Sequence, residues 1–483
     1  METLKFVILL SSIFFCINGD EQAAADYDDT KQGQFSHLCN PNMLASNHSK
    51  IDDQNFCECN FIASVVIGKP VLKIDCMLSD GVTNLTNEIF KAEKLPINTM
   101  TLILSFQMFT SVPFFDGDLK ELEISNNLIT VIRSANFEGI NVLERLDLSY
   151  NRISVVEEKA FSSLKLLHYL DLTSNHLVVV PANTFAPLMT LKTLKVSSNE
   201  GFGRKMGRDA VNSSLLNLYL QLGVTILLES LEMERCNLTK INLMRGVGLR
   251  HLSLRFNDVV DFAMLELPGF IQHLKLSGNP VREINANSLV HVYNVTDMIL
   301  EDMPFLGRVE ENSLHFPYLQ HLSLEGSKNL SFFHPFSTNH QLKVLNLRGC
   351  NLRTLNVSMK EMFEGLDELY LEGNPFTCDC DLQWLKDVDL EINLKCNKPD
   401  EFYGKLLTEI DEEMKCSKIS VFMKKLVNSL ILLALLIGCS IAIWCFFRQL
   451  SPRSRRKNFQ KVGPESPYQR VTIEPNRAEY SLH

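Results

Sequence analysis

Two clusters of cysteines are the residues whose spacing most directly indicates chemistry. The first reads C-x17-C-x-C-x16-C, and the second begins inside "NPFTCDCDLQWL" and continues with two later cysteines. The eight residues are Cys39, Cys57, Cys59, Cys76, Cys378, Cys380, Cys396 and Cys416. Clustered thiols either form disulfides or bind zinc, but the C-x-C spacing and the lack of nearby paired ligands are atypical of zinc sites. We therefore expect disulfides and no metal, if the chain enters an oxidising compartment.

The two ends of the chain predict that compartment. Residues 1–19 place one lysine before a short apolar run and end in small or polar residues, the layout of a cleaved secretory signal. Residues 426–447 contain no charged residue, and as a helix they would extend roughly 33 Å, about one hydrocarbon core. Lysines and arginines predominate directly after this segment, so the positive-inside rule predicts an extracellular N-terminus. The expected protein is single-pass, type I, and at the plasma membrane.

The charge distribution disfavours one class of partner. The chain has 483 residues and a net charge of −10, of which the tail 448–483, with eight basic and three acidic residues, contributes +5. The neutral signal segment leaves −15 for the extracellular part, a poor match for nucleic acid. All seven Asn-X-Ser/Thr sequons fall in that part, which supports the topology. The predicted glycosylation sites are Asn47, Asn84, Asn212, Asn237, Asn294, Asn329 and Asn356.

A repeated motif predicts the elements that position these residues. "LERLDLSYNRISVV" at 143–156 returns as "LHYLDLTSNHLVVV" at 167–180, and the pattern LxxLxLxxNxL recurs mostly every 20 to 24 residues. This is the period of leucine-rich repeats, in which a short strand buries alternate leucines and an inward-turned amide satisfies backbone groups. Because no repeat buries its apolar face alone, neighbours must stack into a curved solenoid with parallel strands on its concave side. The ninth pattern positions are Gln107, Asn127, Asn151, Asn175, Asn199, Cys236, Asn257, Asn279, Met303, Ser327, Cys350 and Asn374.

The repeats and the two cysteine clusters together resemble the extracellular leucine-rich-repeat family with cysteine-rich N- and C-terminal flanks, over about residues 39 to 416. The resemblance implies an α/β solenoid: a horseshoe with a parallel concave sheet and disulfide-stapled caps, here followed by one transmembrane helix. It also implies that each cluster pairs first with third and second with fourth cysteine. The implied disulfides are Cys39–Cys59, Cys57–Cys76, Cys378–Cys396 and Cys380–Cys416.

The resulting organisation divides the chain into eight segments. They are a signal peptide (1–19), an N-terminal linker (20–38), a cysteine-rich N-terminal cap (39–98), about 12 repeats (99–376) with an irregular insertion near 200–227, a cysteine-rich C-terminal cap (377–416), a juxtamembrane segment (417–425), the transmembrane helix (426–447) and the cytoplasmic tail (448–483). The insertion is either a tolerated irregularity or a ligand-contacting loop.

Two cysteines lie among the repeats rather than in the caps. Cys236 and Cys350 are five repeats apart, which at about 4.8 Å per strand separates them by roughly 24 Å, beyond the reach of a disulfide. Both are predicted to be free and buried. The phenylalanines of "EEKAFSSL" and "PANTFAPL" are predicted to pack inside the convex side.

No catalytic motif is present in the sequence, and the tail is too short for an enzymatic domain, so we expect neither an enzyme nor a cofactor. The remaining candidate is the concave surface, where tyrosine, arginine and phenylalanine are the residue types that dominate protein interfaces. The predicted ligand-binding residues are Tyr150, Tyr169, Arg250, His251, Arg255, Phe256 and His273. One column of the pattern reads His251, His273, Asp297 and His321, which is either chance or a pH-sensitive row.

The tail contains Tyr468 followed at +3 by Val471, which resembles a tyrosine-based sorting signal read by a clathrin adaptor. A phosphotyrosine docking site or an inert linker are the alternatives. The function we expect is a cell-surface receptor or co-receptor that binds an extracellular protein ligand and has no signalling domain of its own. The alternative is a homophilic or heterophilic adhesion molecule, and a homodimer stays open.

Overall fold

The structure is a computed structural model, and it divides the chain into two compact units, Met1–Lys415 and Cys416–His483. The residues that the structure describes are 58–63, 70–76, 95, 99–202, 223–224, 226–243, 248–311, 313–314, 316–334, 341–410, 414 and 418–450.

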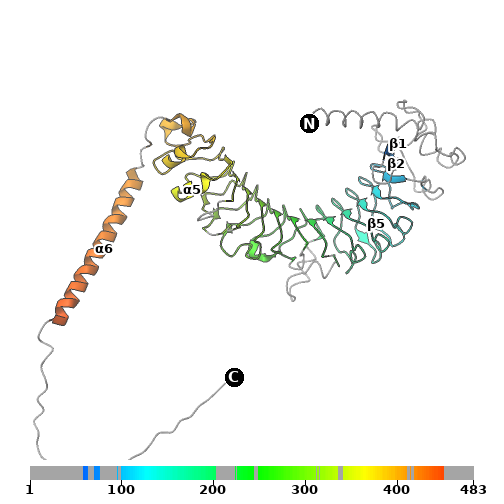
Figure 1. The fold of residues 1–483 in the computed structure, drawn as a ribbon, viewed down its shortest axis with the longest axis horizontal. Coiled ribbons are helices and arrows are strands. Elements are labelled where there is room, and N and C mark those ends of the chain that lie inside the picture. Colours follow the sequence, from blue (N-terminus) through cyan, green and yellow to red (C-terminus); the bar gives the residue numbers. More distant parts are fainter. Residues whose placement is uncertain are drawn as a thin grey trace, which may run out of the picture. The chain divides into compact units, whose positions relative to one another are not determined.

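A single 14-stranded sheet organises the first unit. β1 pairs antiparallel with β2, and every later neighbour in the sheet is parallel. The ribbon curves, with these strands along its inner side (Figure 1). This is the predicted repeat solenoid with a parallel concave sheet. In sheet order the strands are β1 (Glu58–Ala63), β2 (Pro70–Asp75), β3 (Thr99–Ile103), β4 (Glu121–Glu123), β6 (Arg145–Asp147), β8 (Tyr169–Asp171), β9 (Thr193–Lys195), β10 (Ser230–Glu232), β12 (His251–Ser253), β14 (His273–Lys275), β16 (Asp297–Ile299), β18 (His321–Ser323), β20 (Val344–Asn346) and β21 (Glu368–Tyr370).

The ninth pattern position holds the repeats together as predicted. All twelve residues at this position are buried. Asn151 is typical: its Nδ2 donates to the carbonyls of Leu148 (3.1 Å) and Ile124 (2.9 Å), and its Oδ1 accepts from the backbone N–H of Ile129 (3.1 Å). One side chain therefore satisfies backbone groups in its own repeat and in the preceding one, which would otherwise be buried without partners.

Aromatic side chains fill the space between the concave sheet and the return segments. Phe137, Phe161 and Phe185 are buried and stack in sequence, with ring centroids 6.2 and 5.9 Å apart. This confirms the predicted core role of Phe161 and Phe185. Each stacked ring buries a large apolar area that an isolated repeat would expose.

The return segments are mostly turns, because a repeat of 20 to 24 residues leaves little length for a helix beside its strand. The described short helices among the repeats are η4 (Phe262–Met264), η5 (Val357–Met359) and α5 (Lys360–Phe363). Short parallel ladders, which the sequence analysis did not foresee, also link neighbouring return segments. They join β5 (Val131–Ile132) to β7 (Val155–Val156), β11 (Ile241–Asn242) to β13 (Leu265–Glu266), and β15 (Glu283–Ile284) through β17 (Arg308–Val309) to β19 (Phe332–Phe333).

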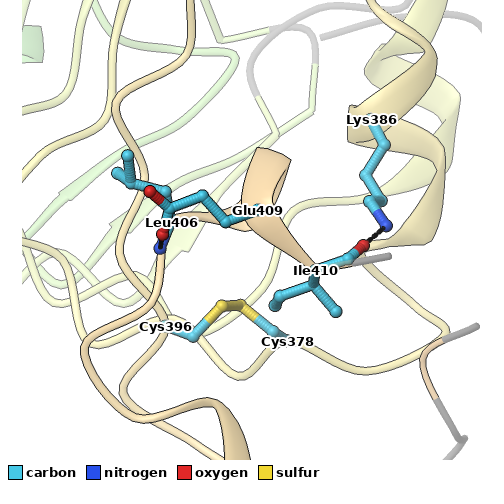
Figure 2. The surroundings of a disulfide bond; sticks show 6 residues. All are labelled: Cys378, Lys386, Cys396, Leu406, Glu409 and Ile410. Carbon is cyan, nitrogen blue, oxygen red and sulfur yellow. Dashed lines mark hydrogen bonds between the residues drawn. A yellow bond between two sulfur atoms is a disulfide. The ribbon is translucent and has the colours of Figure 1, made fainter. Parts of the chain in front are cut away.

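The C-terminal end of the solenoid contains the Cys378–Cys396 disulfide (Figure 2), one of the pairs that the resemblance implies. It lies among three short helices, where Lys386 also donates to the carbonyl of Ile410. Leu385 is buried in this segment, and Trp384 packs on Phe363 of α5, with ring centroids 5.6 Å apart. The three helices are η6 (Gln383–Asp387), η7 (Asp400–Phe402) and η8 (Leu407–Glu409).

Each of the other three implied disulfides includes one cysteine outside the described residues. Cys76 and Cys380 are disulfide-bonded, but their implied partners, Cys57 and Cys416, lie outside the described residues, as does Cys39. The residues predicted as the signal peptide and the linker, most of the insertion near 200–227 and residues 451–483 of the tail also lie outside them.

Cys236 and Cys350 are free and buried, which confirms the prediction. Burial raises the pKa of each thiol to about 12. These thiols are therefore protonated near neutral pH and serve the fold as weak donors, Cys236 to the carbonyls of Val196 and Glu234.

In the second unit, α6 spans Lys418–Leu450. Its segment Lys425–Trp444 is the one described helix that is long and apolar enough to cross a membrane, judged by length and composition. This segment overlaps the predicted span 426–447.

Candidate ligand-binding surface

Each three-residue strand of the sheet buries its middle residue and turns its two flanking residues outward. In β6, Leu146 is fully buried, whereas Arg145 is exposed and Asp147 is half-buried. The parallel register aligns the flanking residues of successive strands, so they form two columns across the concave side.

The first column consists of Thr101, Glu121, Arg145, Tyr169, Thr193, Ser230, His251, His273, Asp297, His321, Val344 and Glu368. The second column consists of Ile103, Glu123, Asp147, Asp171, Lys195, Glu232, Ser253, Lys275, Ile299, Ser323, Asn346 and Tyr370.

A turn residue with positive φ follows three positions after the second column in every one of these repeats. Glycine occupies four of these positions, but Phe106, Tyr150, Arg235 and Phe256 adopt φ values of 51 to 63°. A side chain in this left-handed region costs about 1–2 kcal/mol. Strained bulky residues cluster at functional sites, and Tyr150 is 58% exposed beside the sheet.

Over the early repeats, Tyr169 is the centre of a packed polar group. The Arg145 guanidinium lies 3.6 Å from the centroid of the Tyr169 ring, and the tyrosine hydroxyl donates to Asp171 (3.0 Å). Burial, followed by the Asp171 charge, raises the pKa of Tyr169. Contacts on both the face and the edge of the ring hold it in one orientation, as a preorganised contact residue requires.

Carboxylates line the second column in the same region. Glu123, Asp147 and Asp171 stand opposite one another on adjacent strands. Burial raises the pKa of Asp147, even though Ser149 donates to it from both its hydroxyl (2.6 Å) and its backbone N–H (2.9 Å). The early concave surface is therefore acidic.

Over the middle repeats, Phe256 is clamped between cations. Its ring centroid lies 4.2 Å from the Arg235 guanidinium and 5.2 Å from that of Arg255. The ring rests on Gly278, where a Cβ would come within 2.2 Å of it. The Nε of Arg255 is buried and has no hydrogen-bond partner in the described part of the chain. Two of the predicted ligand-binding residues, Arg255 and Phe256, thus lie together with Arg235, which is not among the predicted ligand-binding residues.

Beside this group the first column forms a continuous row of titratable side chains, which we call the histidine row: His251, His273, Asp297 and His321. The rings of His251 and His273 stack with centroids 4.5 Å apart and an angle of 4° between their planes. His273 Nδ1 lies 3.0 Å from one Asp297 oxygen, and His321 Nδ1 lies 2.7 Å from the other. Neighbouring side chains therefore touch along the whole row.

Arg250 is separated from the other predicted residues. Its guanidinium lies 5.7 Å from the centroid of the Phe270 ring and donates to the Phe270 carbonyl (3.3 Å). Because Arg250 precedes β12, it belongs to the edge where the strands begin and not to either column.

The last repeats contain a second clamped tyrosine that the sequence analysis missed. Arg348 lies 4.2 Å from the centroid of the Tyr370 ring and pairs with Glu372 (2.8 Å), while the Tyr370 hydroxyl donates to Glu368 (2.6 Å). Extending the repeat register to "LYLEGN" would have placed Tyr370 in the second column.

Four of the predicted glycosylation sites lie on described residues. Asn329 and Asn356 are exposed, and Asn237 and Asn294 are half-buried. Asn47, Asn84 and Asn212 lie outside the described residues, as do Tyr468 and Val471 of the tail. Within the described ranges no cluster of histidine, cysteine and carboxylate side chains could hold a metal ion.

Comparison with known proteins supports the repeat. The family model described as "Leucine rich repeat" matches residues 117–177. Matrix-remodeling-associated protein 5 of Homo sapiens is 42% identical over 55 residues, which are 11% of this chain and 2% of that protein. The high affinity nerve growth factor receptor of Gallus gallus is 32% identical over 101 residues, 20% of this chain and 13% of the receptor. The chain thus spans only a small fraction of each of these curated relatives.

Similar solved structures include Toll, in the Toll–Spatzle complex from Drosophila, with a TM-score of 0.46 and 15% identity, covering 68% of this chain and 56% of that one. An internalin from Listeria monocytogenes has a TM-score of 0.41 and 15% identity, covering 64% and 84%. We call the buried residues at the ninth pattern position, most of them asparagines, the repeat ladder. The family match and this repeat ladder together show that the chain contains leucine-rich repeats and that its described solenoid has the leucine-rich-repeat fold.

Proposed function

We propose that this chain is a non-enzymatic cell-surface receptor or co-receptor, which binds an extracellular protein with the concave face of its repeats. In this proposal residues 1–19 are a signal peptide, the capped repeats lie outside the cell, residues 426–447 span the plasma membrane, and the tail recruits partners such as a clathrin adaptor through Tyr468 and Val471.

The observation that supports the proposal most is the clamped aromatic group of Arg235, Arg255 and Phe256. Aromatic and arginine side chains contribute most to binding energy when they are held in place before the ligand arrives. Here the cation–π contacts and the contact with Gly278 hold the ring while leaving it at the surface. The names of the relatives, which include a growth factor receptor and Toll bound to Spatzle, are in keeping with this function.

The proposal is tested by displaying the full chain on cells and screening it against tagged oligomers of secreted and cell-surface proteins, with its own extracellular part included. A partner captured by the wild type should lose at least about 30-fold in affinity on Phe256→Ala, the size expected for a central interface residue. Phe305→Ala is the control, because Phe305 is an exposed phenylalanine that makes none of the contacts of Phe256 with Arg235, Arg255 and Gly278.

Equal affinity of both variants and the wild type would move the binding site away from the middle concave surface. Capture of the protein's own extracellular part alone would favour the alternative, a homophilic adhesion molecule.

A further inference from the structure

The contacts of Asp297 determine where the protons lie in the histidine row. A neutral imidazole that bonds a carboxylate through Nδ1 must have its proton on Nδ1, so its Nε2 is left as an acceptor. This holds for both His273 and His321. Their side chains are 40% and 45% exposed, and neither Nε2 has a hydrogen-bond partner among the described residues. While both imidazoles are neutral, the row therefore presents two acceptor nitrogens that have no partner among the described residues.

The one carboxylate of the row is already occupied. Each Asp297 oxygen bonds one histidine, and Oδ2 also accepts from the hydroxyl of Thr296 (2.6 Å). A basic ligand would have to displace these donors, so the row is a poor site for lysine or arginine of a partner.

Protonation reverses the character of the row. Each imidazole that takes a proton at Nε2 changes from an acceptor to a cationic donor. Protonation of all three histidines changes the net charge of the row from −1 to +2, or from zero to +3 when the neighbouring Lys275 is counted. Stacked imidazolium ions repel, and burial, followed by the neighbouring His273, lowers the pKa of His251.

The acidic groups around the row are engaged by other partners. Glu229 pairs with Lys192 (3.0 Å) and Glu232 with Lys195 (3.1 Å). Glu301 accepts from Ser323 (2.8 Å), and Glu325 accepts from Asn346 (2.7 Å). On the β20 side the row ends at the uncharged Val344. Ser323 and Asn346 are neutral donors, so Glu301 and Glu325 keep their charges, but neither carboxylate bonds a histidine of the row. The exposed Nε2 atoms of His273 and His321 are therefore left to an incoming ligand.

We propose that the histidine row is a binding site for an acidic segment of a protein ligand, occupied when the imidazoles are protonated in a mildly acidic compartment. This rests on the proposed receptor function and adds its ligand chemistry. From the strand of His251 to that of His321 the row spans about 14 Å, the length of four or five residues of an extended peptide. Carboxylates of such a peptide would accept hydrogen bonds from Nε2 of His273 and His321.

The test measures binding of fluorescent hexaglutamate to the full chain in detergent at pH 7.4 and 5.5, at a constant ionic strength of about 0.1 M. Glutamate stays ionised at both pH values, because its ordinary pKa is about 4.3. The wild type should bind the peptide at least about tenfold more tightly at pH 5.5 than at pH 7.4, because proton uptake by the histidines is coupled to peptide binding. The double variant His273→Gln/His321→Gln should lose this difference.

Two further variants separate charge from folding. His321→Lys, whose charge does not depend on pH in this range, should bind hexaglutamate at both pH values. His291→Gln is the matched control, because His291 is exposed and outside the row, and it should behave like the wild type.

Equal binding at both pH values, no binding at pH 5.5, or a pH response that survives in the double variant would each overturn the proposal. A protein partner captured at pH 7.4 would still establish the receptor function in any of these cases. Conversely, the partner screen could fail while pH-dependent peptide binding is observed. That result would overturn the proposed receptor function but would still support the histidine row as a site for acidic peptides.

Discussion

The concave surface over β6 to β9 and the surface over β12 to β18 share one backbone and differ in both chemistry and support. The early surface combines carboxylates with the clamped Tyr169, and the ladder residues beneath it, such as Asn175, are asparagines. The middle surface has the histidine row, and under β16 and β18 the ladder residues are Met303 and Ser327. The outward-facing residues thus vary between the two regions without a change in strand register. The hydrogen bonds that the ladder residues make to the backbone vary independently of them.

The ladder should show the largest difference between the regions. Asn175 bonds the backbone N–H of Ile153 and the carbonyls of Leu148 and Leu172 at 2.9 to 3.0 Å, whereas Ser327 makes contacts of 3.3 and 3.4 Å. Asn175→Ala should lower the free energy of unfolding by about 3–5 kcal/mol, because it leaves buried backbone groups without partners, and Ser327→Ala by about 1 kcal/mol. Urea denaturation followed by circular dichroism measures both. Equal losses would show that the two ladders are equivalent.

The contact between Gly278 and the Phe256 ring should give the next largest effect on stability. Gly278→Ala should lower the free energy of unfolding by about 2–3 kcal/mol, since it combines a left-handed alanine with displacement of the Phe256 ring. Gly349→Ala is the matched control: Gly349 also has positive φ, but a Cβ there would lie 3.8 Å from the nearest atom, so only about 1 kcal/mol should be lost. Denaturation midpoints and partner affinity together check this. A partner that tolerates Gly278→Ala does not depend on the ring.

The acidic early surface should respond to pH in one direction. Burial is the main cause that raises the pKa of Asp147 in the folded state. The carboxylate therefore destabilises the fold fully above its folded-state pKa, and the group has no effect on stability below its ordinary pKa, where it is protonated in both states. Asp147→Asn should therefore stabilise the chain at pH 7.4 by less than about 1 kcal/mol and have no effect near pH 3.5. Denaturation at the two pH values is the measurement. A stabilisation that is independent of pH would point to packing.

Backbone strain at the early surface predicts a smaller gain. Tyr150→Gly removes the steric cost of a tyrosine with positive φ, but glycine also increases the conformational entropy of the unfolded chain. The free energy of unfolding should therefore rise by only about 0.5 kcal/mol. Tyr169→Gly, in a strand and stripped of its cation–π and carboxylate contacts, should instead destabilise by about 2 kcal/mol. Thermal denaturation compares the two. A loss at position 150 would show that its ring packs on the sheet.

The middle surface should respond to pH in the opposite direction, and least of all. Because the pKa of His251 is lowered in the folded state, folding is favoured above its ordinary pKa of about 6.5 and that contribution is lost as pH falls through the folded value. His251→Gln should reduce the loss of stability between pH 7.4 and 5.5 by about 0.3 kcal/mol, because solvent screens so exposed a group. His168→Gln, an exposed histidine outside the columns, is the control and should leave the loss unchanged.

Much of the solenoid was predictable because the repeat period shows which residues occupy equivalent positions in successive repeats. The period placed the strands, the buried ladder and the core phenylalanines Phe161 and Phe185. It also separated Cys236 from Cys350, since residues at the same pattern position lie one inter-strand distance apart for each repeat between them. It did not predict the short ladders between return segments, which depend on how tightly neighbouring turns approach.

The sequence by itself determined which side chains stand in each column, because strand pleating and parallel register follow from the apolar pattern. Only the tertiary structure decided which neighbours make contact: His251 stacks on His273, Asp297 bonds two histidines, Arg235 joins Phe256, and Arg250 turns away to Phe270. The physical reason is that these pairs are 20 to 24 residues apart in sequence, and their rotamers depend on packing and charge in the assembled sheet, which no single repeat contains.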